Sequence, residues 1–231
     1  MEAATKARPS PRRRRLTRER VLEEALRLVD EAGLQALTMR ALAERLSVEA
    51  MALYNHVEGK RGLREGISEL LWAEFERSVD PDPDWRHSMR ALAAGIRRLA
   101  AEHPQAFPLL LASRISPAPG LRAFAAQLEV LQSAGVDERR AADVLRAVFG
   151  YAYGHAVIDL SSLTVREESP DEAGFEALLA LARSLPPDLP PELAEVARVV
   201  CVSDLERQFD VGLEALLAGF DPYCDTLEPT N

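Results

Sequence analysis

Residues 38–60 limit the possible folds of this chain more than any other stretch of its sequence. Leu42 and Leu46 lie four residues apart, which places them on one apolar stripe of a short helix. Leu53 and Val57 repeat this spacing a few residues later, so a second short helix is expected to point its own stripe back at the first. Each helix buries only one side, and the two are therefore expected to pack against each other.

Ser47 and Val48 interrupt the apolar pattern, and the second helix is expected to span residues 49–57. Two short helices joined by a tight turn form a helix-turn-helix, whose second helix fits into the major groove of DNA. We therefore interpret this end of the chain as a DNA-binding unit. The residues expected at the DNA are Thr38, Arg40, Glu49, Ala50, Met51, Ala52, Tyr54, Asn55, His56 and Lys60.

These residues are suited to different contacts. The small side chains of Ala50 and Ala52 let the helix approach base edges, and their methyl groups, like Met51, can touch thymine methyl groups. Asn55 suits an adenine edge or a phosphate. The alternative for Met51 and His56 is that either side chain packs inside the unit instead. Phosphate contacts are expected from Thr38, Tyr54, His56 and Lys60.

The distribution of charge favours a DNA partner, although the net charge of −9 taken alone argues against one. Residues 1–64 hold 14 basic and 9 acidic side chains, which gives a net charge of +5. The remaining residues hold 14 basic and 28 acidic side chains, which gives −14. A basic end on an acidic body suits a protein that meets phosphate with one end only.

Residues 1–16 form a basic arm with four consecutive arginines, two prolines and few apolar side chains, so we expect this arm to be disordered in isolation. One interpretation is a solubilising or localisation tail. The other is an arm that lays arginines into the minor groove beside the helix-turn-helix.

The fold class predicted from the whole chain is all-α, because no alternating strand pattern is bounded by a hairpin turn. Thr17 and Thr38 are expected to cap the first two helices, and Gly33 to end the first. We expect a DNA-binding domain over residues 17–63 and a ligand-binding and dimerisation domain over 64–231. Further helices are expected over residues 60–78, 85–102, 121–134, 137–163, 175–184 and 192–219.

Several classes of protein are disfavoured. The two cysteines lack metal-ligand spacing, and no signal peptide or membrane-spanning stretch is present, so a cytoplasmic protein without metal or cofactor is expected. No phosphate-binding loop or nucleophile elbow occurs. His155 and Asp159, four residues apart, would be the only starting point for an enzyme, and a hydrogen-bonded pair in a helical bundle is the preferred interpretation.

The segment LSVEAMALYNHVEGKRGL resembles the recognition helix of tetracycline-repressor (TetR) family regulators and its junction with the fourth helix. The segments LQSAGVDERRAADVLRAVFGYAYG and LERQFDVGLEALLAGF are similar to the C-terminal domain of the tetracycline-repressor subgroup. The resemblance implies a homodimer in which helices 137–163 and 192–219 of two subunits form a four-helix bundle. It also implies that a ligand bound inside the helical body shifts the fourth helix, spreads the two heads and releases a two-fold symmetric operator.

The resemblance also points to a ligand site within the body. Gln127 and Arg114 match positions that the subgroup uses for tetracycline, whereas Leu110 and Ile158 replace its magnesium-site histidine and glutamate. Glu76 and Leu92 replace the histidine and asparagine that hold the drug's polar edge. We therefore expect a different, more apolar ligand and no metal. The candidate ligand-binding residues are Trp72, Phe75, Met89, Phe107, Leu110, Leu111, Arg114, Phe124, Gln127, Leu145, Phe149 and Tyr153.

Taken together, the sequence predicts a ligand-responsive homodimeric repressor that binds double-stranded operator DNA and a small-molecule effector, with no membrane partner. Two alternatives stay open at this point. One is an activator or regulator of the same fold that has no small-molecule inducer. The other is an enzyme with an accessory DNA-binding head.

Overall fold

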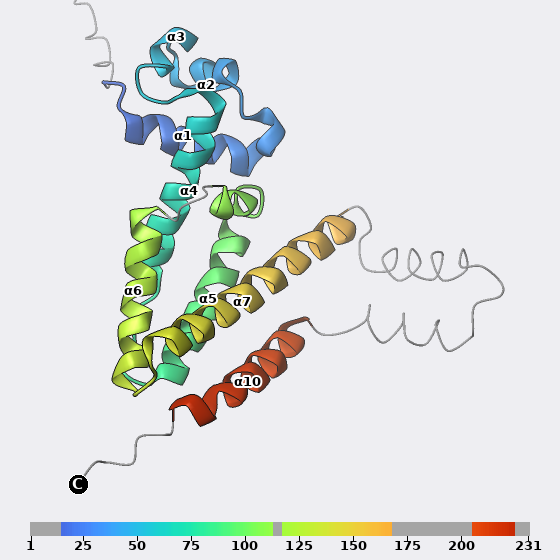
Figure 1. Cartoon of the computed structure of the whole chain (residues 1–231). Helices are drawn as coiled ribbons and strands as arrows, with labels where there is room; N and C mark the ends of the chain where they lie inside the picture. The colour runs from blue at the N-terminus through green and yellow to red at the C-terminus, as the bar shows by residue number, and fades with distance from the viewer. Residues whose placement is uncertain (1–14, 113–116, 168–204, 225–231) are drawn as a thin grey trace, which may run out of the picture.

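The computed structural model describes residues 15–112, 117–167 and 205–224. Every regular element in these ranges is helical, which confirms the all-α prediction. Three short helices form a head at one end of the molecule, and longer helices form the body below it (Figure 1). The elements of the head are α1 (Arg18–Ala32), η1 (Leu34–Ala36), α2 (Met39–Leu46) and α3 (Ala50–Leu53). Those of the body are α4 (Gly59–Ser78), α5 (Trp85–Glu102), η2 (Phe107–Leu111), α6 (Ala118–Ser133), α7 (Glu138–Glu167) and α10 (Leu205–Cys224).

The first two helices of the head begin where the sequence predicts, and α1 ends at Gly33 as predicted. The hydroxyl of Thr17 accepts a hydrogen bond from the Arg20 amide at 3.3 Å, and that of Thr38 accepts one from the Ala41 amide at 3.1 Å. Both are N-caps, because they satisfy an amide that has no partner within the helix. Gly33 follows α1 with φ +78°, a conformation that glycine adopts without strain.

The second helix of the helix-turn-helix is shorter than the predicted span of 49–57. The α-helical part, α3, covers Ala50–Leu53 only, and the next residues form a turn. The carbonyl of Leu53 accepts hydrogen bonds from the amides of both His56 (2.9 Å) and Val57 (3.1 Å), which tightens the chain at that point. The turn then leads into α4 through Gly59, whose φ is +60°, so the chain changes direction instead of extending the helix.

The helices of the body differ from the prediction mainly at their ends. Helix α6 begins at Ala118 instead of residue 121, because Pro119 lies in its first turn, where a missing amide hydrogen costs nothing. Helix α7 continues to Glu167 and α10 to Cys224, beyond the predicted ends at 163 and 219. The helix expected over 175–184 and the start of the one expected over 192–219 lie outside the described residues.

Helix α4 connects the head to the body, and the expected domain boundary after residue 63 falls inside it. At Gly66 it approaches α1 so closely that a Cβ atom would overlap the side chain of Leu22. Further along, the Ser68 hydroxyl and the Trp72 indole both donate to the carbonyl of Leu110, at 3.0 and 2.9 Å. One helix therefore holds the head at its first half and η2 of the body at its second.

Within the described ranges, no helix is both long enough and apolar enough to span a lipid bilayer.

Candidate nucleic-acid interface and interior site

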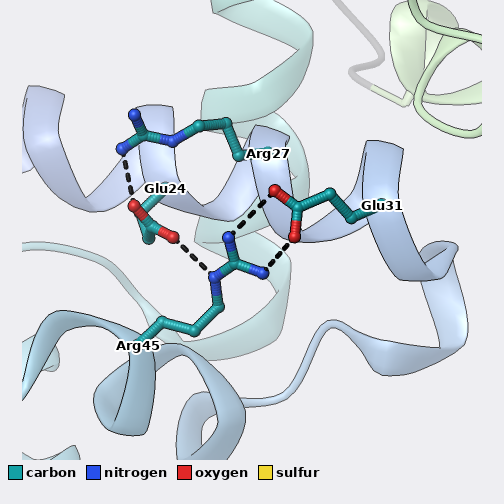
Figure 2. Close-up of polar contacts among 4 residues, drawn as sticks. All are labelled: Glu24, Arg27, Glu31 and Arg45. Atoms are coloured by element: carbon teal, nitrogen blue, oxygen red, sulfur yellow. Dashed lines mark hydrogen bonds and ion pairs between the residues drawn. The ribbon is translucent and has the colours of Figure 1, made fainter.

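A network of ion pairs, which the sequence did not predict, joins α2 to α1 (Figure 2). The guanidinium of Arg45 donates from Nε to Glu24 at 2.5 Å and from both terminal nitrogens to Glu31 at 2.6 and 3.1 Å. Arg27 donates to the other oxygen of Glu24 at 2.5 Å. The hydrogen bond from Arg45 lowers the pKa of the Glu31 carboxyl. The Arg27–Glu24 pair lies within α1 at a spacing of three residues, whereas Arg45 lies on α2 and reaches across to α1, so no local spacing in the sequence indicates its bonds.

Residues of the predicted DNA-binding set lie at the surface of the head. Met51 is 72% exposed, which excludes the alternative that its side chain packs inside the head, and Tyr54 is 53% exposed. Large side chains that are exposed and close together suit a surface that binds a partner. The remaining exposed members are Thr38, Arg40, Glu49, Asn55 and Lys60, and the half-buried ones are Ala50, Ala52 and His56.

Three of the charged or polar members have defined local roles. The Thr38 hydroxyl caps α2, so it lies beside the unpaired amides at the start of that helix, which favour a phosphate. Arg40 pairs with Glu44 at 3.1 Å, but both side chains are mostly exposed, and such a pair holds its partners weakly. Lys60 lies in the first turn of α4, where its charge adds to the positive end of the helix dipole.

A polar hollow of about 420 Å³ lies where the turn after α3 meets α1 and α4. Three of the predicted residues, Tyr54, Asn55 and His56, line this hollow, so the structure brings them together. Arg18 of α1 also lines it and was not predicted; its guanidinium bonds Glu69 of α4 at 2.8 Å. The other lining residues are Val57, Glu58, Gly62 and Glu65.

Several predicted ligand residues meet in a cluster of aromatic rings inside the body. The Trp72 ring stacks on Phe149 with centroids 5.8 Å apart and meets Phe124 edge-on at 5.3 Å. Tyr153 stacks on Phe149 at 6.0 Å and on Phe107 at 5.0 Å. The cluster consists of Trp72 and Phe75 from α4, Phe107 from η2, Phe124 from α6, and Phe149 and Tyr153 from α7.

Gln127 is a polar side chain in the apolar interior, as the sequence indicates, and it is 2% exposed. Its amide oxygen accepts a hydrogen bond of 2.6 Å from the hydroxyl of Ser88, which is fully buried. Ser88 in turn accepts from the amide of Asp82 at 3.2 Å. Sequence reasoning missed Ser88, because a single serine within a helix carries no signal of its own. The pair therefore places a side-chain amide in the largely apolar interior of the body.

The other predicted ligand residues have varied surroundings. Met89, Leu110 and Leu145 belong to the buried core, whereas Leu111 is 51% exposed and lies away from it. Arg114 lies outside the described residues. Among the replacements relative to the tetracycline repressor, Leu92 is buried and Ile158 is 53% exposed.

Glu76 does not direct its carboxylate into the interior. Arg122 of α6 holds it with two hydrogen bonds of 2.6 and 2.8 Å, and this bond lowers the pKa of the Glu76 carboxyl. Glu76 therefore joins α4 to α6 at the surface of the body instead of facing a ligand.

The predicted hydrogen bond between His155 and Asp159 is wrong. Oδ2 of Asp159 accepts from two guanidinium nitrogens of Arg97, at 3.2 and 3.3 Å, while its Oδ1 is buried with no hydrogen-bond partner among the described residues. The ring of His155 packs against Tyr151 and Phe209, with centroids 4.9 and 5.4 Å away. Asp159 bonds Arg97 of α5 instead of His155, because the guanidinium offers a positive charge and two N–H donors at once.

Comparison with known proteins assigns both parts of this arrangement. Residues 21–67 match the family described as "Bacterial regulatory proteins, tetR family", and residues 79–222 match "Tetracyclin repressor-like, C-terminal domain". The chain is 30% identical to the class D tetracycline repressor protein of Escherichia coli, over 90% of each chain. It is 31% identical to an HTH-type transcriptional regulator of Saccharopolyspora erythraea, over 88% of this chain and 84% of that one.

Among solved structures, ActR of Streptomyces coelicolor in complex with actinorhodin superimposes with a TM-score of 0.75. The two chains are 25% identical, and the match covers 91% of this chain and 98% of ActR. The shared fold spans both the head and the body. This chain is therefore a transcriptional regulator of the TetR family, with a DNA-binding helix-turn-helix domain and a ligand-binding C-terminal domain.

Proposed function

We propose that this protein is a homodimeric repressor that binds a palindromic operator and is released from it by a planar, largely apolar effector. The observation that carries the proposal is that α4 belongs to both sites. Its first turn presents Lys60 beside the DNA-binding turn, and its second half contributes Trp72 and Phe75 to the aromatic cluster. A ligand that separates those rings would displace α4, and with it the head that packs against the first half of α4.

Two features of α7 and α10 support pairing of two copies. Gly150 and Gly154 are exposed on α7, and a Cβ atom at either would meet nothing within 4 Å among the described residues; Gly219 of α10 is open in the same way. Glycines four residues apart let a second helix approach closely, and Val211 of α10 adds an apolar side chain that is 60% exposed. Pairing through these helices gives the two heads a two-fold relation, which matches a palindrome.

The interior favours an aromatic effector. Leu92 and Leu110 offer no polar side-chain atoms to a ligand, and the Glu76 carboxylate is already held by Arg122. Aromatic rings such as Trp72 and Phe149, which stack on each other here, can also stack on the flat ring of a ligand. The similar ActR structure holds actinorhodin, and other relatives are named tetracycline repressors. We therefore propose a polycyclic aromatic effector oriented by the amide of Gln127, without a bound metal ion.

The test begins with selection of bound duplexes from random DNA, followed by release assays with anthraquinone-2-carboxylate and with tetracycline plus magnesium as probes. We expect a palindromic duplex, release by the anthraquinone and weaker release by tetracycline. The variant Phe149→Leu should weaken release, and Arg139→Gln, which changes an exposed side chain on α7, should leave it unchanged. If no duplex is selected, or if tetracycline with magnesium is the better probe, the proposal is wrong.

Oligomeric state is tested separately by light scattering. The wild-type chain should be a dimer, Gly154→Ala should weaken it and Gly154→Leu should yield monomers, because the larger side chain keeps the second helix away. A monomeric wild type, or a Gly154→Leu variant that stays dimeric at wild-type affinity, contradicts the proposed interface.

A further inference from the structure

A cluster of three ionisable side chains joins the head to the body at the C-terminal end of α5. His103 follows α5, Asp30 lies in the last turn of α1, and Glu74 lies on α4. The Nδ1 atom of His103 lies 2.8 Å from Oδ2 of Asp30, and its Nε2 atom lies 3.2 and 3.3 Å from the two oxygens of Glu74. The side chains of all three are at least two-thirds buried. One imidazole therefore bridges a carboxylate of the head and a carboxylate of the body.

This geometry selects the charged form of the histidine. An ionised carboxylate only accepts hydrogen bonds, and a neutral imidazole has only one N–H to donate, so it can satisfy one of the two carboxylates. The imidazolium has two N–H groups and satisfies both. With both ring nitrogens of His103 within hydrogen-bond distance of a carboxylate, the bridge is complete only when the ring is protonated.

The surroundings of the ring act in the same direction. Burial alone lowers the pKa of His103, but the hydrogen bond and charge of Asp30 and the charge of Glu74 outweigh burial, so the pKa lies above the ordinary value of 6.5. Burial raises the pKa of Asp30, whose Oδ1 has no hydrogen-bond partner among the described residues. The charged groups that face the ring are Asp30 from α1 and Glu74 from α4, with Glu31 of α1 acting on Asp30. All three are acidic, and Glu31 is itself held by Arg45 of α2.

His103 is also connected to the aromatic cluster through the backbone. Its carbonyl accepts a hydrogen bond of 2.7 Å from the amide of Phe107, the residue of η2 that stacks on Tyr153. On the other side, Glu74 lies two residues after Trp72 on α4. A ligand that moves Phe107 or Trp72 therefore moves one end of the bridge directly.

We propose that protonated His103 is a positioning residue that clamps α1 of the head to α4 and α5 of the body and transmits movement of the aromatic cluster to the head. This regulatory consequence rests on the proposed function. The clamp holds the head in one orientation, which lowers the cost of ordering it on DNA. As the pH rises from 6.5 through the raised pKa of His103, the proton is lost, one carboxylate loses its partner, and both stability and operator affinity fall.

The first experiment needs neither DNA nor effector. The imidazole resonances of the full chain are titrated by NMR in the wild type and in Asp30→Asn and Glu74→Gln, which keep the size of each side chain. The midpoint for His103 should lie above 6.5, and Asp30→Asn should lower it by about one pH unit. A midpoint at or below 6.5 in the wild type, or one that neither variant moves, overturns the clamp.

The second experiment compares operator affinity, for the duplex selected above, at pH 6.0 and pH 8.5. The affinity of the wild type should fall about fivefold or more beyond that of His103→Gln, since couplings between sites are typically worth at least about that factor. His87→Gln, which changes an exposed histidine on α5, should behave as the wild type does. Equal pH dependence in the wild type and His103→Gln overturns the role in regulation. If no duplex binds while the NMR midpoint is raised, the proposed function fails and the clamp itself stands.

Discussion

The head and the body of this protein are held together by contacts of different range along the chain. In the head, Arg45 bonds Glu24 and Glu31, at most 21 residues away, and each helix cap lies within three residues of its partner. In the body, Trp72 and Phe149 stack although 77 positions separate them, and Arg90 bonds Glu214 across 124. The contacts named in the head are thus close along the chain, whereas those in the body join distant parts of it. The two regions should therefore respond differently to truncation of one side chain.

The largest effect is expected from Phe107→Ala in the body. The ring is fully buried and stacks on Tyr153, so its removal leaves a cavity and should lower the free energy of unfolding by about 3–5 kcal/mol. Leu111→Ala, on the same short helix but 51% exposed, should change it by less than about 0.5 kcal/mol. Denaturant unfolding followed by circular dichroism measures both. Equal losses would mean that the interior relaxes around Phe107 and that its buried ring contributes no more to stability than the exposed Leu111 side chain.

A smaller effect, on DNA binding alone, is expected from Lys60→Ala in the head. Loss of one phosphate contact should weaken binding to all sequences roughly three- to tenfold at low salt and reduce the slope of log affinity against log salt by about one. Tyr54→Ala should also weaken binding regardless of sequence, whereas Asn55→Ala should change which sequences are preferred. Binding measured over a range of salt concentrations distinguishes these results. Wild-type affinity in both Tyr54→Ala and Lys60→Ala would show that the head docks in some other way.

The same difference in range explains what the sequence could and could not predict. The caps at Thr17 and Thr38, the turn at Ser47 and the exposed set around Tyr54 depend on neighbouring residues, and local patterns indicated the caps and the turn correctly. The early end of α3 was missed, because it follows from the entry into α4 at Gly59.

In the body, the identity of the aromatic residues was predicted but not their mutual stacking. Which ring faces which depends on how α4, η2, α6 and α7 pack, and helical spacing alone does not specify this. Polar contacts between distant helices were missed for the same reason. The bond of Arg97 to Asp159 and the bridge formed by His103 join residues 62 and 73 positions apart.

The network around Arg45 tests whether polar contacts organise the head. Arg45→Gln leaves the carboxylates of Glu24 and Glu31 close together without a shared partner, so the head should unfold at a lower temperature and the variant should bind DNA more weakly. Arg61→Gln, which breaks an exposed pair with Glu65 on α4, is the matched control and should leave the melting temperature unchanged. Raising the salt concentration should reduce the difference between wild type and Arg45→Gln. A melting temperature for Arg45→Gln equal to that of Arg61→Gln would show that the network contributes nothing to the head.

The smallest effect, and one of opposite sign, is expected at the turn of the helix-turn-helix. Ser47 has φ +54° and ψ +45°, a left-handed conformation that strains any residue with a Cβ atom. Ser47→Gly removes this strain while keeping the backbone bond from the Val48 amide to the Ala43 carbonyl, so it should stabilise the head by about 0.5–1 kcal/mol. Ser133→Gly, at the right-handed end of α6, should instead destabilise the chain slightly. Hydrogen exchange of the α2 and α3 amides localises the effect. If protection rises at α2 and α3 but operator affinity stays constant, the turn contributes rigidity only; if stability falls, the serine conformation is held by contacts that glycine cannot replace.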